Sequence, residues 1–589
     1  MVTTLMKTVD SSNKVKMQKE QPKSLLVVDC ETTGTNPHFA ELLGVASYID
    51  NKTDYLTLRS GNQTPALAVS DLFSLLQRNG KDKPFLIGHN AKYDSIILRR
   101  AGVAPFWVHY DTMIALYLLE IDKPRKLETA YERITGVKKK DLLEIYNETT
   151  GKELKNLPQK WYEEVPEERL QEYAKQDAAA TFQLYEYTNK KLEGRLRDWF
   201  FQVEMPLVNI LTEMELKGVK VDREKLNNFK LDLEKRRGNL QDKLRHLAGD
   251  PELNLNSPNQ LQDVLFKKFK LQKGRKTKTG FSTDKKVLDK LKDTHAFPKL
   301  LLQFNEIDDL LAKFLGPLPE YMDRFDRIHC NYKQAWTKTR RFSCEEPNLQ
   351  QIPSKTELGK KVRECFVPEN GSYFLVADYD QVELRILAHL SEEPALIDAF
   401  NTGVDIHQRT ADMMKVDRYL GKIFNFSIIY GKTAFGFAQD LNCSEKEAQE
   451  LIDKYFSGLP KVREYIEDIR LQCIKNKGWL NTISGLPVYC GDPLTNSKAM
   501  REYVMRCAVD YRIQGSSQDI LKKAVVNVYQ HLGHVPVLMV HDELVFELES
   551  YCMEADAAIA AEIVGIMERA WNLKVPLKVS YKITERWEK

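Results

Sequence analysis

No stretch of this sequence approaches the ~20 consecutive apolar residues that a helix needs to cross a bilayer, so we expect no membrane-spanning segment. The nine cysteines include no Cys-x-x-Cys pair, which argues against a structural zinc site or a disulfide framework and favours a reducing intracellular compartment. There is no internal repeat of the kind that builds solenoids. What remains is a composition typical of soluble globular proteins. At about 150 residues per domain, the 589 residues predict three or four folding units.

The chain changes character after its first residues. Residues 1–23 are polar and lysine-rich, and we expect them to form a disordered tail. From Ser24 onward the pattern is mixed α/β. The apolar runs LLVVD and PFLIG predict buried strands, and charged amphipathic stretches predict helices. The predicted helices are Asp141–Leu154, Glu168–Lys191 and Lys217–His246, and a further helix start is expected after Asn254–Pro258.

A net charge of only +3 conceals a strongly basic region. Between Lys217 and Lys292 there are 21 Lys and Arg against 10 Asp and Glu, and Phe266–Gly280 holds seven basic residues and no acid. Such a block is either a solvated tip or an element that contacts phosphates, because neutralising phosphates releases counterions and supplies affinity. Charge alone leaves both interpretations open.

A first set of polar residues follows the two predicted strands near the N-terminus. Asp29 and Glu31 stand two apart at the end of LLVVD, so both carboxylates point to the same face. Two acids on one face repel each other unless a cation lies between them, and a divalent metal is the usual solution. Taken alone, this pair is more often a strand end in solvent. The other members are Asn90 and Asp94 in GHNAKYD, and Tyr173 and Asp177 in YAKQD.

These three motifs, in this order and spacing, resemble those of DnaQ-like 3′→5′ exonucleases, which have an RNase H-like fold. The resemblance implies that two divalent ions activate water and stabilise the leaving 3′-oxygen. It also implies that Tyr173 orients the attacking water. By the same resemblance the metal ligands are Asp29, Glu31, Asp94 and Asp177.

A second set of acids lies in the C-terminal half. FLVADYDQVELRILAHLS is an apolar strand that ends at Asp378 and continues into a helix. PVLMVHDELVFEL is two apolar strands joined at His541, Asp542 and Glu543, which we place at a hairpin tip so that both acids can approach one site. A turn residue is the simpler interpretation of either acid, since turns favour Asp.

Between these segments, RYLGKIFNFSIIYG places two cations and two aromatic residues at steps of four. A step of four is about 400° on a helix, so the four side chains share one broad face. A packing helix would carry aliphatic residues there. Cations for triphosphate oxygens followed by flat rings for sugar and base favour a nucleotide site. The residues are Arg418, Lys422, Phe426 and Tyr430.

Together these segments resemble motifs A, B and C of family A DNA polymerases, which are similar to bacterial DNA polymerase I. The resemblance implies that Asp378 and Asp542 bind two metal ions, Mg²⁺ with Mn²⁺ as a possible substitute, and that Glu543 assists. It further implies that Glu383 excludes a ribose 2′-hydroxyl and that His407 lies near the phosphates. The partners implied are primer–template DNA and dNTPs. The residues implied to contact DNA are Arg341, Arg506, Gln514, His541, Lys273, Arg275, Lys276 and Lys278.

Two positions depart from the family pattern. Arg340 stands where the family usually has Gly, and we expect this cation to alter how the minor groove is followed. Asp510 replaces a common Asn four residues before Gln514, which puts that template contact in doubt. The link between His407 and Arg418 is shorter than in the bacterial enzymes, which predicts shortened fingers. This feature and the lysine-rich character resemble the polymerase module of apicomplexan plastid (apicoplast) replication proteins. That resemblance implies an apicoplast location, a monomer, and a primase or helicase in the same replication system.

The two resemblances imply a multidomain α/β and α+β fold, an RNase H-like exonuclease followed by a right-hand polymerase. Three alternatives are weaker. A single-subunit RNA polymerase would not need Glu383, a scaffold with decayed sites would not keep all the acids, and a dedicated exonuclease would not need the cation–aromatic face. The expected domains are an exonuclease at 24–195 and a polymerase at 196–589, with the thumb at about 210–325, the palm at about 326–395 and 505–589, and the fingers at about 396–504.

Overall fold

The computed structural model describes residues 25–58, 84–278, 280–441, 443–549 and 553–588. The chain divides into two compact units between Asn209 and Ile210. The tail predicted at 1–23 lies outside the described residues. Among the helices that the structure describes, none combines the length and the apolar character needed to cross a membrane.

The first unit is built on a five-stranded sheet with the order β3-β2-β1-β4-β5. Its central strand, β1, pairs antiparallel with β2 and parallel with β4, and Val27 lies opposite Ile87. The strands predicted from LLVVD and PFLIG are confirmed as β1 and β4. The five strands are β1 (Leu25–Thr32), β2 (Leu42–Ile49), β3 (Lys52–Thr57), β4 (Phe85–Gly88) and β5 (Tyr110–Asp111).

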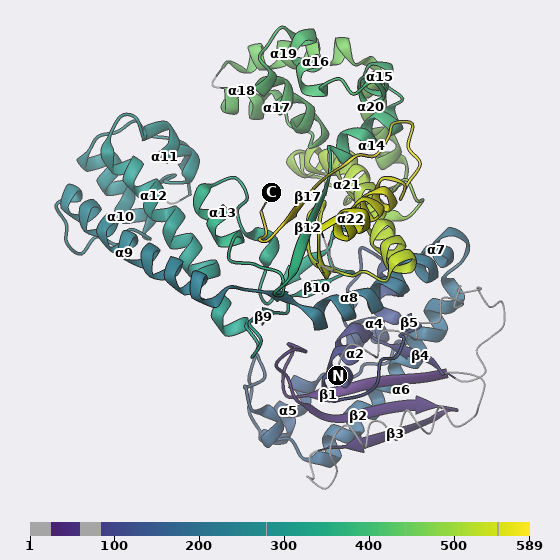
Figure 1. Ribbon diagram of the computed structural model, residues 1–589. Coiled ribbons are helices and arrows are strands. Elements are labelled where there is room, and N and C mark those ends of the chain that lie inside the picture. Colours follow the sequence, from purple (N-terminus) through teal and green to yellow (C-terminus); the bar gives the residue numbers. More distant parts are fainter. Residues whose placement is uncertain (1–24, 59–83, 279, 442, 550–552, 589) are drawn as a thin grey trace. The chain divides into compact units, whose positions relative to one another are not determined.

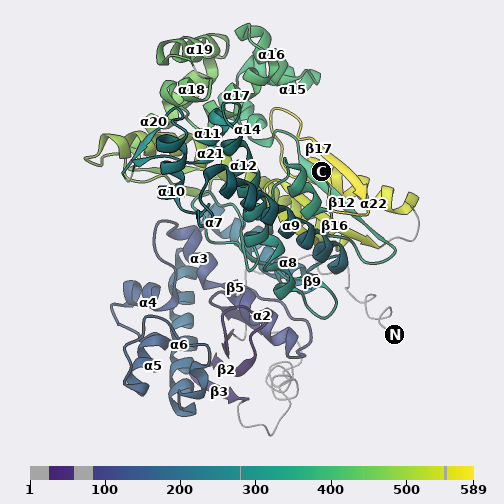
Figure 2. The ribbon, with the colours of Figure 1, turned by 90° about the vertical axis from the view of Figure 1, so that its left-hand side faces the viewer.

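Helix α6 (Glu167–Lys191) packs along this sheet against β1, β2 and β3 (Figures 1 and 2). Leu170, Ala174 and Asp177 are all buried, and their spacing of three to four residues places them on one face of the helix. The sequence therefore carries an acid into the buried side of α6. The predicted helices are confirmed in α5 and α6. The other helices of this unit are α2 (Ala91–Arg100), α3 (Thr112–Leu119), α4 (Leu127–Thr135), α5 (Leu142–Thr150) and α7 (Gly194–Trp199).

The second unit contains a four-stranded antiparallel sheet with the order β15-β16-β12-β17. Strand β12 is central, and its apolar residues Phe374, Leu375 and Ala377 have no exposed surface. Helix α22 packs on β17 and on α21, α21 packs on α14, and α14 begins three residues after β12 ends. These elements are β12 (Ser372–Tyr379), β15 (Pro536–Val540), β16 (Glu543–Glu549), β17 (Val579–Thr584), α14 (Val382–Ser391), α21 (Lys498–Leu532) and α22 (Met553–Glu568).

The basic region forms a helical group with a core of its own. The helix predicted from Lys217 begins only at Arg223, because Val219–Lys220 forms strand β6 and Asp222 caps the following turn through Lys225 N–H. Ser257 caps the helix expected after Asn254–Pro258. The region is preceded by α8 (Met205–Lys217) and begins with β6 (Val219–Lys220). The helical group consists of α9 (Arg223–Ala248), α10 (Pro258–Gln262), β7 (Lys276–Thr277), β8 (Gly280–Phe281), α11 (Lys285–Leu291) and α12 (Ala296–Leu310). Their buried core includes Leu244, Leu265, Leu288, Phe297 and Leu301.

Six consecutive helices lie between β12 with α14 and the long helix α21. Helix α17 packs on α16, and the ring of Phe424 in α17 stacks on Phe437 in α18 with centroids 4.4 Å apart. This packing buries one face of α17 and leaves the opposite face open. The helices are α15 (Pro394–Thr402), α16 (Ile406–Met414), α17 (Arg418–Ile429), α18 (Ala434–Leu441), α19 (Glu445–Gly458) and α20 (Pro460–Lys475). The shorter elements are α13 (Glu357–Arg363), β9 (Arg327–Ile328), β10 (Asn331–Lys333), β11 (Ser343–Glu345), β13 (Trp479–Asn481) and β14 (Pro487–Tyr489).

Candidate functional site

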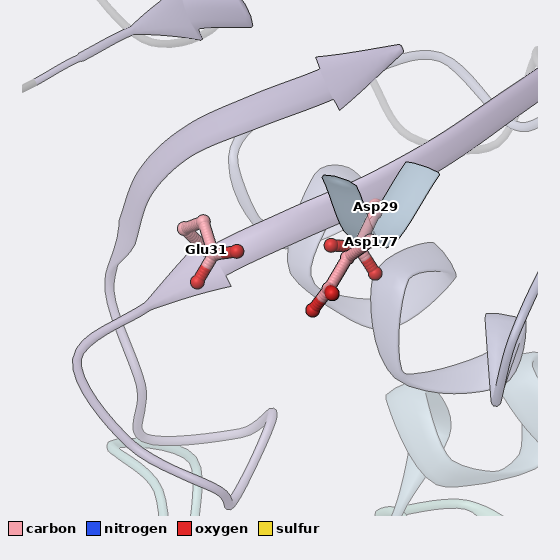
Figure 3. A group of neighbouring side chains, drawn as sticks. All are labelled: Asp29, Glu31 and Asp177. Carbon is pink, nitrogen blue, oxygen red and sulfur yellow. The ribbon is translucent and has the colours of Figure 1, made fainter. Parts of the chain in front are cut away.

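Three acids meet beside β1 in the first unit. Asp29 and Glu31 project from β1 beside Asp177 of α6 (Figure 3). Each offers one carboxylate oxygen, and these three oxygens lie within 4.8 Å of one another. The strand alternation predicted from D-x-E and the helix position predicted from Y-x-x-x-D therefore converge on one site.

Burial and crowding hold protons on these acids. Burial, and then the nearby Asp177 carboxylate, raise the pKa of Glu31 to about 8. Burial followed by the charges of Asp177, Asp94 and Glu31 raises the pKa of Asp29 well above its usual range. Burial also raises the pKa of Asp177 to about 6, although Lys139 lowers it. A bound cation would allow all three acids to ionise and would therefore stabilise the cluster.

Asp94 has a different position from the other three acids. It lies in the first turn of α2, and its Oδ1 accepts a hydrogen bond of 2.8 Å from the backbone N–H of Cys30. Burial raises the pKa of Asp94 to about 7, and the hydrogen bond from Cys30 opposes that shift. Asp94 is thus hydrogen-bonded to β1 at the residue between Asp29 and Glu31, and its charge acts on both of these acids. Its predecessor Asn90 caps α2 with a backbone φ of 65°.

The structure adds a residue that the sequence did not indicate. The side chain of Lys139 is 4% exposed, its ammonium pairs with Asp177 Oδ1, and it lies 4.1 Å from the centre of the Tyr173 ring. Tyr173 also hydrogen-bonds Asp177. In the sequence Lys139 is the middle of three lysines, a pattern typical of a solvated segment, and only the packing against α6 distinguishes it.

In the second unit, the predicted hairpin tip is confirmed. Val540 pairs with Glu543, so the two-residue turn His541–Asp542 joins β15 to β16, with His541 at φ 58°. Asp378 on β12 lies directly opposite Glu543, and Tyr379 N–H donates to the Asp542 carbonyl at 3.3 Å. The register therefore brings Asp378, Asp542 and Glu543 to the same end of the sheet.

Buried residues fix the position of the Glu543 side chain. Its carboxylate is buried, accepts a hydrogen bond of 2.8 Å from Trp587 Nε1, and lies 3.5 Å from the guanidinium of Arg363. The Arg363 guanidinium is itself stacked 4.1 Å from the Trp587 ring centre. Burial lowers the pKa of Arg363, while the charges of Glu543 and Asp378 oppose that shift. Glu543 thus has less freedom than the half-buried Asp378 and Asp542.

The predicted face of α17 is confirmed as the open one. Arg418, Lys422 and Tyr430 are exposed, and Phe426 is half-buried. Arg418 Nε pairs with Asp405 Oδ2 at 2.7 Å. His407 lies below this face: it is buried, with its ring centre 5.6 Å from that of Phe426 and its Nδ1 hydrogen-bonded to Asn425 at 3.1 Å.

One carboxylate joins three segments that are far apart in the sequence. Glu383 in α14 accepts a hydrogen bond of 2.7 Å from Arg341 and another of 2.8 Å from the Tyr430 hydroxyl. Glu383 is buried, so its position is well defined. Three of the predicted site residues therefore meet at the end of α17, beside α14.

Comparison with known proteins agrees with this geometry. Residues 223–589 match the protein-family model described as DNA polymerase family A, and residues 4–193 match the model described as 3′-5′ exonuclease. The chain belongs to DNA polymerase family A. An exonuclease-like region followed by a family A polymerase region confirms the predicted fold class.

Similar proteins place the chain among relatives of bacterial DNA polymerase I. It is 34% identical over 583 residues to DNA polymerase I of Geobacillus stearothermophilus, covering 96% of this chain and 64% of the relative. DNA polymerase I of Bacillus subtilis is 33% identical over 95% of this chain and 63% of its own length. The chain thus spans a little under two thirds of these relatives. A solved structure, the POL domain of Pol1 from M. smegmatis in complex with DNA primer-template and dNTP, aligns with a TM-score of 0.82 and 28% identity, covering 96% of this chain and 95% of that one.

Several other predicted residues of the family A region lie near this end of α17. Gly431 follows α17 with φ 64°, and a Cβ there would lie 2.8 Å from Arg506 Cγ, so glycine is required for Arg506 to pack. Tyr430 and Arg506 line one cleft together with Ser427 and Lys432. Gln514 donates to Asp510 Oδ1 at 2.5 Å. Burial, and then the charge of Glu383, raise the pKa of Asp510 to about 6.

Arg340 lies in the protein interior, and its expected effect on how the minor groove is followed stays a prediction. Its side chain has no exposed surface, and its guanidinium pairs at 3.2 Å with Asp519 of α21, which is also fully buried. Asp519 in turn accepts a hydrogen bond from Ser484. Arg340 therefore ties its loop to α21.

The basic side chains of residues 273–278, called the basic tip from here on, are exposed. Both a phosphate-contacting element and a solvated tip would be exposed in this way. Lys276 begins the short hairpin of β7 and β8, and Lys273 lies 5.1 Å from the ring centre of Phe281. Lys273, Arg275, Lys276 and Lys278 are all exposed. Their exposure fits both interpretations of this segment.

The acid clusters suit Mg²⁺, because carboxylate oxygens are the ligands that this hard cation prefers. We expect a measurable consequence for stability. The folded chain keeps protons on Glu31, whose pKa rises from 4.5 to about 8, so without metal the stability falls as the pH rises through that window. Added Mg²⁺ should raise the melting temperature by several degrees at pH 8 and by much less at pH 5.5, given about 2–4 °C per kcal/mol for units of this size.

Differential scanning calorimetry of the full chain, with EDTA or with Mg²⁺, measures this difference. The double variant Asp29→Asn with Glu31→Gln removes the two acids and serves as the control, because it should lose most of the pH dependence. An equal effect of Mg²⁺ at the two pH values would contradict the account of the acid cluster.

Proposed function

We propose that this chain is a DNA-templated DNA polymerase that extends primer 3′ ends with dNTPs and carries a 3′→5′ proofreading exonuclease. The observation that carries the proposal is the placement of Asp378, Asp542 and Glu543 at one end of a sheet, in a chain of family A. Asp378 and Asp542 would hold two Mg²⁺ ions, which when bound would supply activation of the primer hydroxyl and neutralisation of the charge on the leaving pyrophosphate. The chain itself positions the reactants and excludes alternatives.

The open face of α17 is proposed to hold the nucleotide. Arg418 and Lys422 can donate to triphosphate oxygens, and Phe426 and Tyr430 offer flat surfaces to sugar and base. His407 supports this face through its contact with Phe426. A solved relative of this chain was studied with primer-template DNA and a dNTP, which is consistent with the same substrates here.

Glu383 is proposed to select deoxynucleotides. Arg341 and Tyr430 hold its carboxylate at the end of α17, where a ribose 2′-hydroxyl would meet it. We expect Glu383→Ala to reduce the ratio of dNTP to rNTP insertion by at least about 10-fold, equivalent to ~1.4 kcal/mol. Single-nucleotide insertion on one primer–template measures both rates.

Two variants control for indirect effects on that ratio. Tyr430→Phe removes the hydroxyl that donates to Glu383 but keeps the carboxylate, so discrimination should persist. Glu392→Ala changes an exposed acid just after the same helix and should have no effect. Equal insertion of dNTPs and rNTPs by the parent protein would instead favour an RNA polymerase.

The acid cluster on β1 is proposed as the exonuclease site. Asp29, Glu31 and Asp177 would bind one or both metal ions, with Asp94 completing the ligand set from α2. Tyr173, hydrogen-bonded to Asp177, would orient the attacking water. When bound, the metal supplies Lewis-acid activation of water and charge stabilisation of the leaving 3′-oxygen.

The remaining predicted residues are proposed to contact DNA. The exposed lysines and Arg275 of the basic tip suit duplex phosphates, which are bound through charge and not through sequence. Arg341, Arg506, Gln514 and His541 lie around the polymerase acids and the end of α17, where primer terminus and template would meet.

The biological setting is proposed from resemblance alone. The lysine-rich composition and shortened fingers favour replication and repair of the apicoplast genome by a monomer that works with a primase or helicase. Imaging of the tagged full-length protein in an apicomplexan parasite tests the location, and a signal outside the plastid would overturn it.

A further inference from the structure

A buried lysine is part of the acid cluster in the first unit. The side chain of Lys139 is 4% exposed, and that of its partner Asp177 is 7% exposed. The ammonium contacts Asp177 Oδ1 and lies 4.1 Å from the centre of the Tyr173 ring. It therefore touches two of the residues that the proposed exonuclease needs.

The neighbouring lysines show that this placement is specific. Lys138 pairs with Glu144 and Lys140 with Glu148, and these two lysine side chains are 66% and 56% exposed. The segment between α4 and α5 thus directs one of three consecutive lysines inward. A buried ammonium is retained only where its charge is compensated. Here Asp177 supplies that compensation, and the carboxyl groups of Asp29 and Glu31 lie close by.

We propose that Lys139 is a positioning residue that sets the metal affinity of the exonuclease site, because its ammonium shares the Asp177 carboxylate with the divalent ions. This inference rests on the proposed exonuclease function. The pairing keeps Asp177 and Tyr173 aligned, and the same positive charge repels a divalent ion that binds the neighbouring oxygens. Lys139 thereby keeps the site from filling at low metal concentration, and nucleolysis becomes dependent on the ambient Mg²⁺ level.

The proposal predicts that removing the charge makes metal binding tighter. We would titrate Mn²⁺ into the full chain and follow free Mn²⁺ by electron paramagnetic resonance. Asp378→Asn and Asp542→Asn in the background remove the proposed metal ligands of the polymerase site. Lys139→Met should lower the dissociation constant for Mn²⁺ by at least about 10-fold. The Mn²⁺ concentration for half-maximal 3′ shortening should fall in parallel.

Lys140→Met is the matched control. It removes the same charge from the next residue in the chain, whose side chain is exposed. It should change the dissociation constant by less than about twofold. If circular dichroism shows that Lys139→Met does not fold, Lys139→Gln replaces it, because it is also neutral but can hydrogen-bond Asp177.

The outcomes separate this inference from the proposed function. Unchanged or weaker Mn²⁺ binding in the neutral variants would overturn the role of Lys139 and leave the exonuclease site intact. The double variant Asp29→Ala with Glu31→Ala tests the metal site itself. If the parent and the lysine variants show no saturable Mn²⁺ binding, or only binding that survives in this double variant, the proposed metal site is wrong. Tighter binding in Lys139→Met, with Lys140→Met unchanged, would establish the proposal.

Discussion

Asp542→Ala should reduce primer extension by about 10³-fold or more, the scale expected when stabilisation of a transferring phosphoryl group is lost. Asp542 lies in a two-residue turn directly beside Asp378. Its backbone carbonyl makes the contact with Tyr379, so the hairpin should survive loss of the carboxylate. Single-turnover insertion of one dNTP measures the effect.

The other activity should not respond to this change. The acids proposed for nucleolysis belong to the first compact unit, and Asp542 belongs to the second. We therefore expect 3′ shortening by Asp542→Ala to equal that of the parent. Glu549→Ala, at the exposed far end of β16, the strand that follows the turn, is the matched control and should extend primers normally. Normal extension by Asp542→Ala would remove this residue from the polymerase site.

The double variant Asp29→Ala with Glu31→Ala should show the reverse behaviour. Both carboxylates lie on the same side of β1 beside Asp177, so the change removes two of the three clustered oxygens. We expect 3′ shortening to fall by about 10³-fold or more while dNTP insertion is unchanged. Shortening of a labelled single strand without dNTPs measures this loss.

A second measurement on the same variant checks the physical cause. Glu31 is buried, Asp29 is half-buried, and both lie close to Asp177 and Asp94, an arrangement that raises their pKa values. Their removal should therefore raise the melting temperature of the chain in EDTA at pH 8. Glu172→Ala, on the exposed side of α6, should alter neither nucleolysis nor stability. Loss of primer extension together with nucleolysis would show that the two sites are not separable.

Local pattern predicted much of both sites. Strand alternation is sufficient to place Asp29 and Glu31 on one face, and a four-residue step is sufficient to place Tyr173 and Asp177 on one face of a helix. The hairpin at His541 and Asp542 follows from two apolar runs with a short polar break. These features depend on neighbours within a few residues, which is the range over which sequence pattern carries information.

The features that could not be predicted depend on contacts between distant segments. Lys139 lies in a run of lysines typical of solvent exposure, and its burial follows from packing against α6. In the sequence Arg340 looks like a cation that contacts DNA. Its partner in the fold, Asp519, is 179 residues away, so the sequence pattern does not reveal the pair. Glu543 owes its fixed position to Trp587, 44 residues further along the chain. Charge pattern alone cannot distinguish such buried pairs from exposed ones.

The pairing of residues between neighbouring strands could not be predicted from the sequence either. The Asp378–Glu543 pairing depends on the antiparallel match of β12 with β16, and on the turn that precedes Glu543. Likewise, Glu383 meets Arg341 and Tyr430 only because α14, α17 and a preceding loop converge. The residues were predicted individually, and the hydrogen bonds that hold them became apparent only in the fold.

We expect this one chain both to extend and to shorten primer 3′ ends. The most direct test of this expectation is a labelled primer–template incubated with the protein and Mg²⁺, once with all four dNTPs and once with none. We expect full extension in the first reaction and stepwise 3′ shortening in the second. Shortening in both reactions, with no extension at any dNTP concentration, would contradict it.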